Sequence, residues 1–254
     1  DLWFSDQATA IFAYGHIRDW NVSQVTDMTE AFMNRSGFNE DISGWDVSNV
    51  TMMNRMFKGA VSFNQPIGGW DLSSVRWMGS LFYGAISFNQ PIGDWNVSSA
   101  RDMNHVFARA SSFNQPIGDW NVSSATKLHH TFFEAVSFNQ SIAEWNVSSV
   151  TDMSKMFDNA HSLSQETKLE IHQTFSSNPN WPYDWKVSET ASSSPGGNQS
   201  LTDEVQDSPD EDHGIPDGDS TSPEDHYYTP DQGDSIPDVG FISTDGTAQS
   251  SGEG

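Results

Sequence analysis

The chain contains 254 residues and no cysteine, and its 35 acidic and 11 basic side chains give a formal net charge of −24. All lysines and arginines precede residue 190, whereas residues 191–254 hold 15 acids and no base. Nucleic-acid backbones and anionic membrane surfaces are bound through lysine and arginine, so this balance argues against both partners. The absence of cysteine excludes disulfides and thiolate catalysis, and no apolar run reaches the length of a membrane span.

Residues 1–16 precede a long repeat and are predicted to form an N-terminal helical cap. Ser5 or Asp6 is suited to cap the start of a short helix, and Gly15 is suited to end it. Such a cap is needed because the open end of a repeat stack would expose its core to water. The apolar face of the helix would consist of Ala8, Ile11 and Phe12.

A 25-residue repeat occupies residues 17–163. Its apolar columns are isoleucine at 17, 42, 67, 92, 117 and 142, tryptophan at 20, 45, 70, 95, 120 and 145, and phenylalanine at 32, 57, 82, 107, 132 and 157. A fixed period of this length is typical of a solenoid, in which each repeat buries its apolar face by stacking on its neighbours.

Two kinds of secondary structure are predicted within each repeat. The opening Ile-x-x-Trp-x-Val, as in residues 92–97, has the spacing of a leucine-rich repeat, and its alternation predicts a short strand with Trp95 and Val97 inward. Strands stack about 4.8 Å apart and helices are about 10 Å wide, so the strands would take the concave side of a curved stack. The helix is predicted from the i, i+3, i+4, i+7 spacing of Met103, Val106, Phe107 and Ala110.

The predicted fold class is therefore α/β, a curved leucine-rich-repeat-like solenoid of six strand–helix repeats. Asparagine recurs in it at 39, 64, 89, 114 and 139. A side-chain amide repeated in register can bond the backbone of the neighbouring repeat, and buried turn backbone needs such partners. We therefore predict a structural ladder of asparagines in preference to a ligand site.

Residues 164–189 are predicted to form a C-terminal cap. Residues 164–176 have the pattern of a helix with Ile171 and Phe175 on one face. The aromatic side chains of residues 178–185 would then lie across the last repeat and shield it from water.

Residues 190–254 are rich in serine, threonine, proline, glycine and acids, with few apolar side chains. A segment of this composition buries too little surface to offset its ordering entropy, which predicts a disordered acidic tail or linker. Asp217-Gly-Asp219 and several Pro-Asp pairs offer carboxylates, but they lack the spacing of an EF-hand loop. We expect at most weak calcium binding there and no other cofactor.

Two segments of the repeat match a known pattern. They are Trp145-Asn-Val-Ser-Ser-Val-Thr-Asp-Met153 with Met156-Phe157, and Ser87-Phe-Asn-Gln-Pro-Ile92. In both, the chain resembles the BspA-like leucine-rich-repeat surface proteins, and the resemblance covers residues 1–185. It implies a secreted or surface-anchored protein associated with adhesion or binding of other macromolecules, and it implies no enzymatic activity.

No catalytic constellation is found in the sequence, which lacks G-x-S-x-G, P-loop and H-E-x-x-H motifs. His105 and His130 are one period apart, which would make them neighbours on the predicted helical face. His129 and His130 are adjacent and would not share a helix face, so we expect solvated histidines rather than a metal site. Trp77 and Tyr83 lie outside the repeated columns and are candidates for exposed contact residues.

The sequence predicts a binding surface on the concave strand face, in the two polar columns that flank each tryptophan. Stacking would place Asp94, Asp119 and Glu144 side by side, where charges about 4.8 Å apart repel by roughly 0.9 kcal/mol in water. A merely solvated acidic face tolerates this cost, whereas the sharper hypothesis is a surface that binds a divalent cation or a basic or hydroxyl-rich ligand. We name as the acidic ledge the candidate residues Asp46, Asp71, Asp94, Asn96, Asp119, Asn121, Glu144 and Asn146.

These observations favour a non-catalytic, secreted or cell-surface protein that binds or adheres to an extracellular protein or glycan, and that we expect to be monomeric. Two alternatives stay open: a structural spacer or stalk that presents another domain, and a non-catalytic module of a larger secreted hydrolase. The chain begins at Asp1 rather than methionine and shows no signal peptide, so we interpret it as a mature or excised fragment without its signal and anchor.

Overall fold

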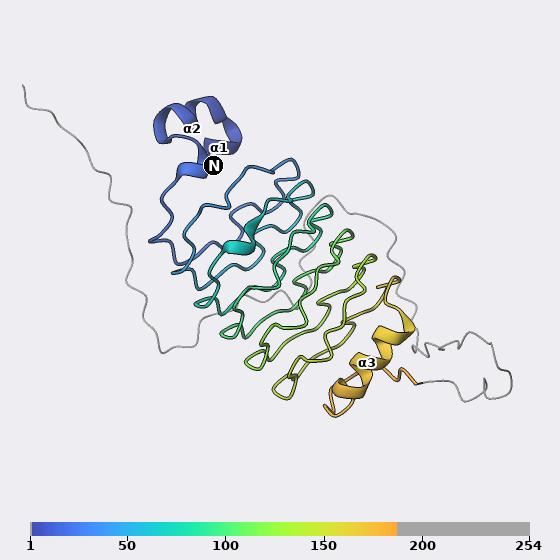
Figure 1. Cartoon of the computed structure of the whole chain (residues 1–254). Coiled ribbons are helices and arrows are strands. Elements are labelled where there is room, and N and C mark those ends of the chain that lie inside the picture. The colour runs from blue at the N-terminus through green and yellow to red at the C-terminus, as the bar shows by residue number, and fades with distance from the viewer. Residues whose placement is uncertain (1, 187–254) are drawn as a thin grey trace, which may run out of the picture. The chain divides into compact units, whose positions relative to one another are not determined.

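The computed structural model describes residues 2–186 (Figure 1). The predicted tail of residues 190–254 lies outside the described residues, as do positions 187–189 of the predicted C-terminal cap. The described part pairs its coils through single parallel β-bridges and contains no longer strand. Its helices are α1, Leu2–Ser5, α2, Gln7–Tyr14, and α3, Gln165–Phe175, with the short 3-10 helices η1, Ile17–Asp19, and η2, Ile67–Gly69.

Residues 25 positions apart lie side by side, so that the chain completes one coil per repeat (Figure 1). Five parallel bridges join six successive coils at Asp27↔Met52, Met52↔Trp77, Trp77↔Asp102, Asp102↔Lys127 and Lys127↔Asp152. Beside each bridge, alternate backbone N–H groups donate to carbonyl oxygens of the next coil. In the first coil the donors are Met28, Glu30, Phe32 and Asn34, and the acceptors, at 2.7–2.9 Å, are Met52, Asn54, Met56 and Lys58.

Both elements predicted within each repeat are wrong: the bridged residues lie at a different position from the predicted strand, and turns take the place of the predicted helix. The bridged residue is Asp102, beyond the predicted strand around Trp95, and residues 103–110 form successive turns. No α-helix occurs between α2 and α3. The reason is that the N–H groups of His105, Phe107 and Arg109 bond the next coil, whereas an α-helix needs each of them to bond the carbonyl four residues back.

Each coil contains two residues with left-handed backbone, four positions apart. Such a residue is the third position of a type II turn, and it stops an α-helix from propagating. Glycine fills the position at Gly59, where a Cβ would lie 2.6 Å from Asn34 Oδ1, and at Gly84. Elsewhere the position is filled, with φ of 51–60°, by Glu30, Asn34, Arg55, Ser80, His105, Arg109, His130, Glu134, Lys155 and Asn159.

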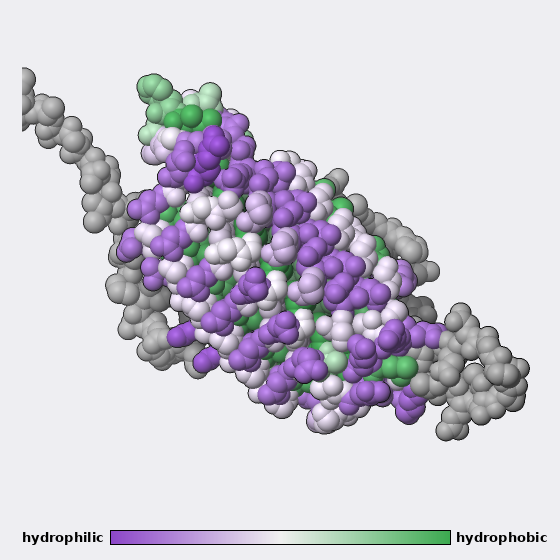
Figure 2. All heavy atoms as spheres, viewed as in Figure 1, coloured by the Kyte–Doolittle hydropathy of each residue, from purple (hydrophilic) through white to green (hydrophobic). Residues whose placement is uncertain are grey.

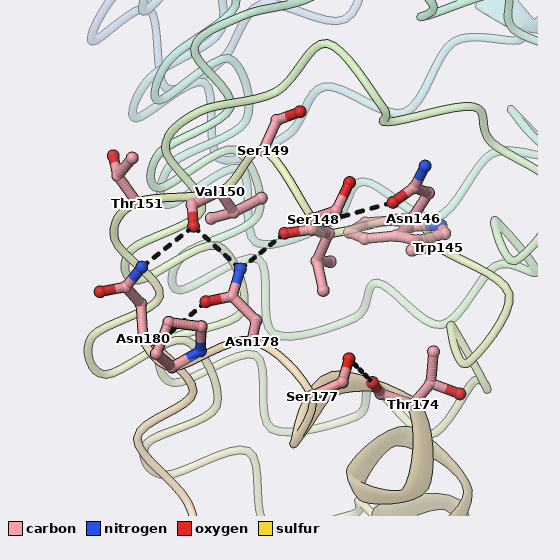
Figure 3. Close-up of a pocket in the computed structure, with 12 residues that line it drawn as sticks. Trp145, Asn146, Ser148, Ser149, Val150, Thr151, Thr174, Ser177, Asn178 and Asn180 are labelled. Carbon is pink, nitrogen blue, oxygen red and sulfur yellow. Dashed lines mark hydrogen bonds between the residues drawn. The ribbon is translucent and has the colours of Figure 1, made fainter.

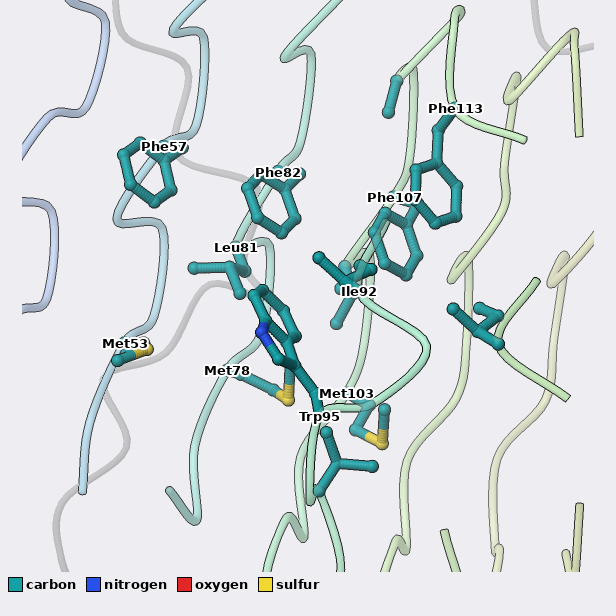
Figure 4. Packing of buried hydrophobic residues seen from close by; sticks show 14 of the residues in the cluster. Met53, Phe57, Met78, Leu81, Phe82, Ile92, Trp95, Met103, Phe107 and Phe113 are labelled. Carbon is teal, nitrogen blue, oxygen red and sulfur yellow. The ribbon is translucent and has the colours of Figure 1, made fainter. Parts of the chain in front are cut away.

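The repeated apolar columns form one continuous core (Figure 4), which confirms that the phenylalanine column and the tryptophan column from Trp45 on are buried, while Trp20 of the first repeat is half-buried. Phe107 is fully buried, and its ring centroid lies 5.8 Å from that of Phe82 and 5.7 Å from that of Phe132. The indole N–H of Trp95 donates to the Ile67 carbonyl oxygen of the preceding coil at 3.1 Å. Equivalent bonds are made by Trp45, Trp70, Trp120 and Trp145.

The predicted asparagine ladder is confirmed. In four coils the asparagine Oδ1 accepts the backbone N–H of the asparagine in the next coil at 2.8–3.0 Å. The last one, Asn139, accepts the N–H of Ser164 at 2.8 Å, where the repeat gives way to α3. The neighbouring glutamines add to the ladder, since Gln115 Nε2 donates to both the carbonyl oxygen and the Oδ1 of Asn89 at 3.0 Å.

The N-terminal helices cover the first coil with a different face from the predicted one. Asp6 caps α2 and Gly15 ends it, as the sequence predicts. The expected buried face is wrong, because Ile11 is 41% and Phe12 94% exposed. Figure 2 shows apolar surface, in green, in the region of α1 and α2. The sequence does not predict helix α1, and the buried positions are instead Trp3 of α1 and Ala10 of α2.

At the other end, α3 lies within the predicted helix of residues 164–176 and buries Ile171 and Phe175. The aromatic segment that follows packs on Phe157 of the last coil. The ring centroids of Trp181, Tyr183 and Trp185 lie 6.2, 6.1 and 5.5 Å from that of Phe157.

The hydroxyl of Tyr183 also accepts a hydrogen bond that, in the preceding coils, a backbone carbonyl oxygen of the next coil accepts. Its hydroxyl accepts the N–H of Phe157 at 2.8 Å and donates to Asp158 Oδ1 at 2.7 Å. In the preceding coil, the equivalent N–H of Phe132 donates to the Met156 carbonyl oxygen at 2.8 Å. The hydroxyl therefore occupies the place of a carbonyl group of a further coil, and burial, which raises the pKa of Tyr183, keeps it protonated.

Candidate functional site

Side chains that differ from coil to coil collect on one surface, beside the β-bridges. One column of this surface consists of Glu30, Arg55, Ser80, His105, His130 and Lys155, whereas the core column two positions further on is phenylalanine in all six coils. The repeated residues hold the coils together, whereas the differing ones change without altering the core. We name as the ladder face the exposed and half-buried side chains of residues 27–34, 52–59, 77–84, 102–109, 127–134 and 152–159.

Aromatic and charged side chains from several coils meet on the ladder face. The guanidinium carbon of Arg109 lies 5.8 Å from the ring centroid of Tyr83 and 5.9 Å from that of Phe133. Its Nε lies 3.0 Å from Glu134 Oε2, and Lys58 Nζ lies 5.1 Å from the Tyr83 ring. We name these five residues the aromatic–arginine patch. Arg109 is held by its neighbours although its side chain is 46% exposed.

Three histidines form a cluster beside this patch. Each of His105, His129 and His130 offers one ring nitrogen within 4.8 Å of the others. The rings of His105 and His130 stack with centroids 4.6 Å apart, and the His129 ring meets them edge-on at 5.0 and 5.7 Å. Tyr83 and Phe133 lie beside the cluster, with centroids 6.1 Å from that of His105 and 5.3 Å from that of His130, respectively.

Burial sets the charge state of two of these histidines. Desolvation lowers the pKa of His105 to about 3, with smaller contributions from the neighbouring His130 and His129. Desolvation also lowers the pKa of His130, although the carboxylates of Asp158 and Asp152 act in the opposite direction. Both imidazoles are therefore neutral at pH 7, and each has a nitrogen lone pair to offer.

Two nitrogens of the histidine cluster have no hydrogen-bond partner. The Nδ1 atoms of His129 and His130 are buried and unbonded. Asp152 Oδ2 lies 3.4 Å from His129 Nδ1, but without the geometry of a hydrogen bond, and Asp152 Oδ1 accepts the N–H of Ser154 at 2.9 Å. Buried polar atoms in folded proteins are bonded in the great majority of cases, so this cluster retains an unused capacity to bind.

The expectation of solvated histidines is wrong for these three, which are half-buried. That expectation assumed a helix, on which His129 and His130 would diverge. The left-handed backbone of His130, with φ of 56°, instead leaves the two ring centroids 5.7 Å apart. The sequence contained one signal for the cluster, the one-period spacing of His105 and His130.

The acidic ledge is exposed at all eight predicted positions. In the column after each tryptophan, the side-chain oxygens are engaged within their own coil. Asx turns of this kind are a local structural use of aspartate and asparagine, and they account for the recurrence of these residues without a ligand. The Oδ1 atoms that accept the N–H of the serine two residues on, at 2.9–3.2 Å, belong to Asp46, Asp71, Asn96, Asn121 and Asn146.

The carboxylates in the column before each tryptophan, unlike the side chains in the column after it, are not engaged within the coil. Within residues 2–186, Asp94, Asp119 and Glu144 form no hydrogen bond or ion pair. Trp95, Trp120 and Trp145 beside them stack with ring centroids 6.1 and 6.2 Å apart, which sets the spacing of the coils at this column. These three carboxylates keep their binding capacity, and ligand binding on the ledge stays a prediction. The two off-column candidates, Trp77 and Tyr83, lie half-buried on the ladder face.

A hollow of about 330 Å³ lies where the segment after α3 meets the last coil (Figure 3). Asn178 Nδ2 donates to the carbonyl oxygens of Val147 and Val150 at 2.7 and 2.9 Å, and Asn180 Nδ2 donates to that of Val150 at 3.3 Å. Among the ledge residues, Asn146 lines this hollow. The side-chain amides of Asn178 and Asn180 hold the C-terminal cap to the last coil. Among the described residues, no titratable side chain lines the hollow.

Comparison with known proteins assigns the repeat to a family. Residues 3–115 and residues 90–178 each match the family described as Mycoplasma protein of unknown function, DUF285. No curated protein and no solved structure matches the chain. Among residues 2–186, no helix combines the length and the apolar character that crossing a membrane requires. Since the two matches together span residues 3–178, more than half of the chain, this protein belongs to the DUF285 family.

Proposed function

We propose that this chain is a non-catalytic binding module of a BspA-like, leucine-rich-repeat-like solenoid protein, secreted or held at a cell surface, that recognises an extracellular protein. The observation that supports the proposal is the division of its surface. The repeated phenylalanine and asparagine columns are buried or bonded within the stack, whereas the ladder face carries columns whose side chains change in charge and size from coil to coil. A repeat protein that varies one surface on a constant core is suited to recognition.

The aromatic–arginine patch has the composition of a protein interface. Tyrosine and arginine are enriched among the residues that contribute most binding free energy at such interfaces. Arg109 is already oriented by Glu134 and by the rings of Tyr83 and Phe133, so it would lose little conformational entropy on binding. Together with Lys58, Arg109 forms a locally basic centre on a chain whose net charge is −24. This basic centre suits a partner with carboxylates at its surface.

The test is a binding screen with the full chain against an array of extracellular proteins, with a glycan array in parallel. We expect a protein partner whose binding falls at least tenfold in Arg109→Ala and in Tyr83→Ala. The matched control is the acidic-ledge variant Asp94→Asn/Asp119→Asn/Glu144→Gln, which should bind as the parent does. The reverse pattern would place recognition on the ledge, a glycan partner would correct the class of ligand, and two empty arrays would favour a spacer or a module of a larger hydrolase.

A second candidate site is the acidic ledge, and the unbonded carboxylates of Asp94, Asp119 and Glu144 favour it. Carboxylates in adjacent coils suit a calcium ion, which takes oxygen ligands. Calorimetry with calcium on the full chain and on the ledge variant tests this. Equal heats from both proteins would show that the ledge is only a solvated acidic surface.

A further inference from the structure

We propose that His105, His129 and His130 bind a divalent transition-metal ion on the ladder face, with zinc as the representative ion. The inference rests on the geometry of the histidine cluster and does not depend on the proposed function. It assigns a use to three imidazoles that the core does not need, because each lies at a position that other coils fill with residues such as Asn54, Asn104 or Lys155.

The three rings are close to the arrangement that a tetrahedral ion requires. Zinc–nitrogen bonds of 2.0–2.1 Å place two ligand nitrogens about 3.4 Å apart, and the nitrogens here lie within 4.8 Å of one another. Because imidazole lone pairs lie in the ring plane, the stacked rings of His105 and His130 must tilt apart to share one ion. This rotation of three half-buried side chains needs shifts of about 1 Å in their ring nitrogens.

The donor chemistry selects the class of ion. Neutral imidazole nitrogens suit zinc, copper and nickel, whereas calcium and magnesium prefer oxygen ligands. The Nδ1 atom of His130 is buried without a partner, so a metal ion would satisfy a polar atom that is now desolvated without compensation. His129, whose Nδ1 faces Asp152, would bind the ion through its other ring nitrogen. Three histidines leave a fourth tetrahedral position for a water molecule or for a group of a binding partner.

Charged side chains of both signs surround the histidine cluster. Asp152 and Asp158 lie near enough to raise the pKa of His130, whereas Lys155 acts on His130 and Lys58 on His105 in the opposite direction. Asp152 has a further role, because its Oδ2 lies 3.4 Å from His129 Nδ1. A carboxylate beside a metal-binding histidine orients the ring and raises its basicity.

The experiment is a titration of the untagged, metal-free full chain with zinc chloride at pH 7.5, followed by calorimetry. We expect one saturable site per chain. The affinity should fall at least tenfold in His105→Gln and in His130→Gln, and about tenfold in Asp152→Asn, since loss of a carboxylate next to a ligand typically costs 10–100-fold. The matched control is His161→Gln, an exposed histidine outside the cluster, which should bind zinc as the parent does.

Two further readouts separate a lost ligand from a lost fold. Saturating zinc should raise the thermal midpoint of the parent and of His161→Gln but not that of His130→Gln, whose far-UV spectrum should be unchanged. Copper(II) bound to the parent should show hyperfine coupling to three nitrogens in its electron paramagnetic resonance spectrum. No saturable zinc binding, or equal affinity in the parent and all cluster variants, would overturn the proposal.

Discussion

The acidic ledge and the ladder face are both polar surfaces of one coil stack, but their side chains are held in different ways. On the ledge, Asn96 and its equivalents accept the N–H of a serine two residues on, so each coil completes its own turn. On the ladder face, Arg109 lies between rings of the two neighbouring coils, and His105 stacks on His130 of the next one. Hydrogen bonds within one coil orient the side chains of the ledge, whereas contacts between neighbouring coils orient those of the ladder face.

This difference shows how to interpret periodicity in a repeat protein. A polar residue that returns in every coil is explained by the backbone that it bonds, as in the asparagine ladder and the Asx turns. A polar or aromatic residue that appears in one or two coils, such as Tyr83 or His129, has no such explanation. Departures from the repeat therefore mark the positions whose side chains the stack itself does not explain, and the following predictions test that distinction.

The largest effect is expected from the core that both surfaces share. Phe107→Ala should lower the free energy of unfolding by about 3–5 kcal/mol, because it removes a fully buried ring stacked between two others. Urea denaturation measures this loss. The matched control is Phe133→Ala on the ladder face, where the half-buried ring should cost much less. Similar losses at the two positions would show that the ladder face is part of the core.

Acid should destabilise the ladder face in a pH range in which the ledge is unaffected. The pKa of His105 is about 3 in the folded chain and 6.5 ordinarily, so below pH 6.5 the unfolded chain binds a proton that the folded chain does not. Stability should be constant above pH 6.5 and fall by roughly 2–3 kcal/mol by pH 4.5. Urea denaturation across this range measures the slope, and His105→Gln should flatten it.

The ledge titrates in a lower range. Hydrogen bonds from Ser48 and Ser73 lower the pKa of Asp46 and of Asp71 below the ordinary 3.8. Their contribution to stability is present above pH 3.8 and is lost as the pH falls below it. Equal slopes above pH 4.5 in the parent and in His105→Gln would contradict the assignment of the upper range to the histidine cluster.

A smaller loss is expected at the asparagine ladder. Asn89→Ala removes the acceptor of the Asn114 N–H and of the Gln115 amide, which should cost about 1–3 kcal/mol because a part-buried donor is left without a partner. Thermal and urea denaturation measure this. Asn89→Asp keeps an acceptor in place and should lose less, and an equal loss in both variants would mean that packing rather than the hydrogen bond stabilises the ladder.

The smallest effect is expected at the ledge itself. Asn96→Ala removes an exposed Asx turn to Ser98 and should cost about 0.5 kcal/mol, the low end of the range for a hydrogen bond. The thermal midpoint measures the change. A loss as large as that of Asn89→Ala would mean that the turns within coils are as important as the bonds between them.

The sequence predicts which side chains are buried better than it predicts the backbone that buries them. The tryptophan and phenylalanine columns, the asparagine ladder and α3 all follow from spacing, because spacing reports which residues share an interior. Met103, Val106 and Phe107 have the spacing of a helix, yet consecutive turns place the same residues inward. The choice between helix and turns is made by hydrogen bonds to the next coil, which no local pattern encodes.

The candidate site was harder to predict for the same reason. Gly59, Gly84, Asn34 and Asn159 are of types that favour left-handed backbone, whereas side chains such as Glu30, Arg55 and Lys155 adopt it against their intrinsic preference and give no sign of it in the sequence. The spacing of His105 and His130 shows that they are neighbours, but the contribution of His129 depends on the backbone of the residue after it.

The hydroxyl of Tyr183 sets the length of the array. Each coil offers N–H donors to a successor, and the phenol supplies an acceptor to the last coil that has no successor. Any number of 25-residue units could therefore be inserted before this terminator without changing either end. Tyr183→Phe would leave the Phe157 N–H, a backbone donor at the last edge of the stack, without this acceptor.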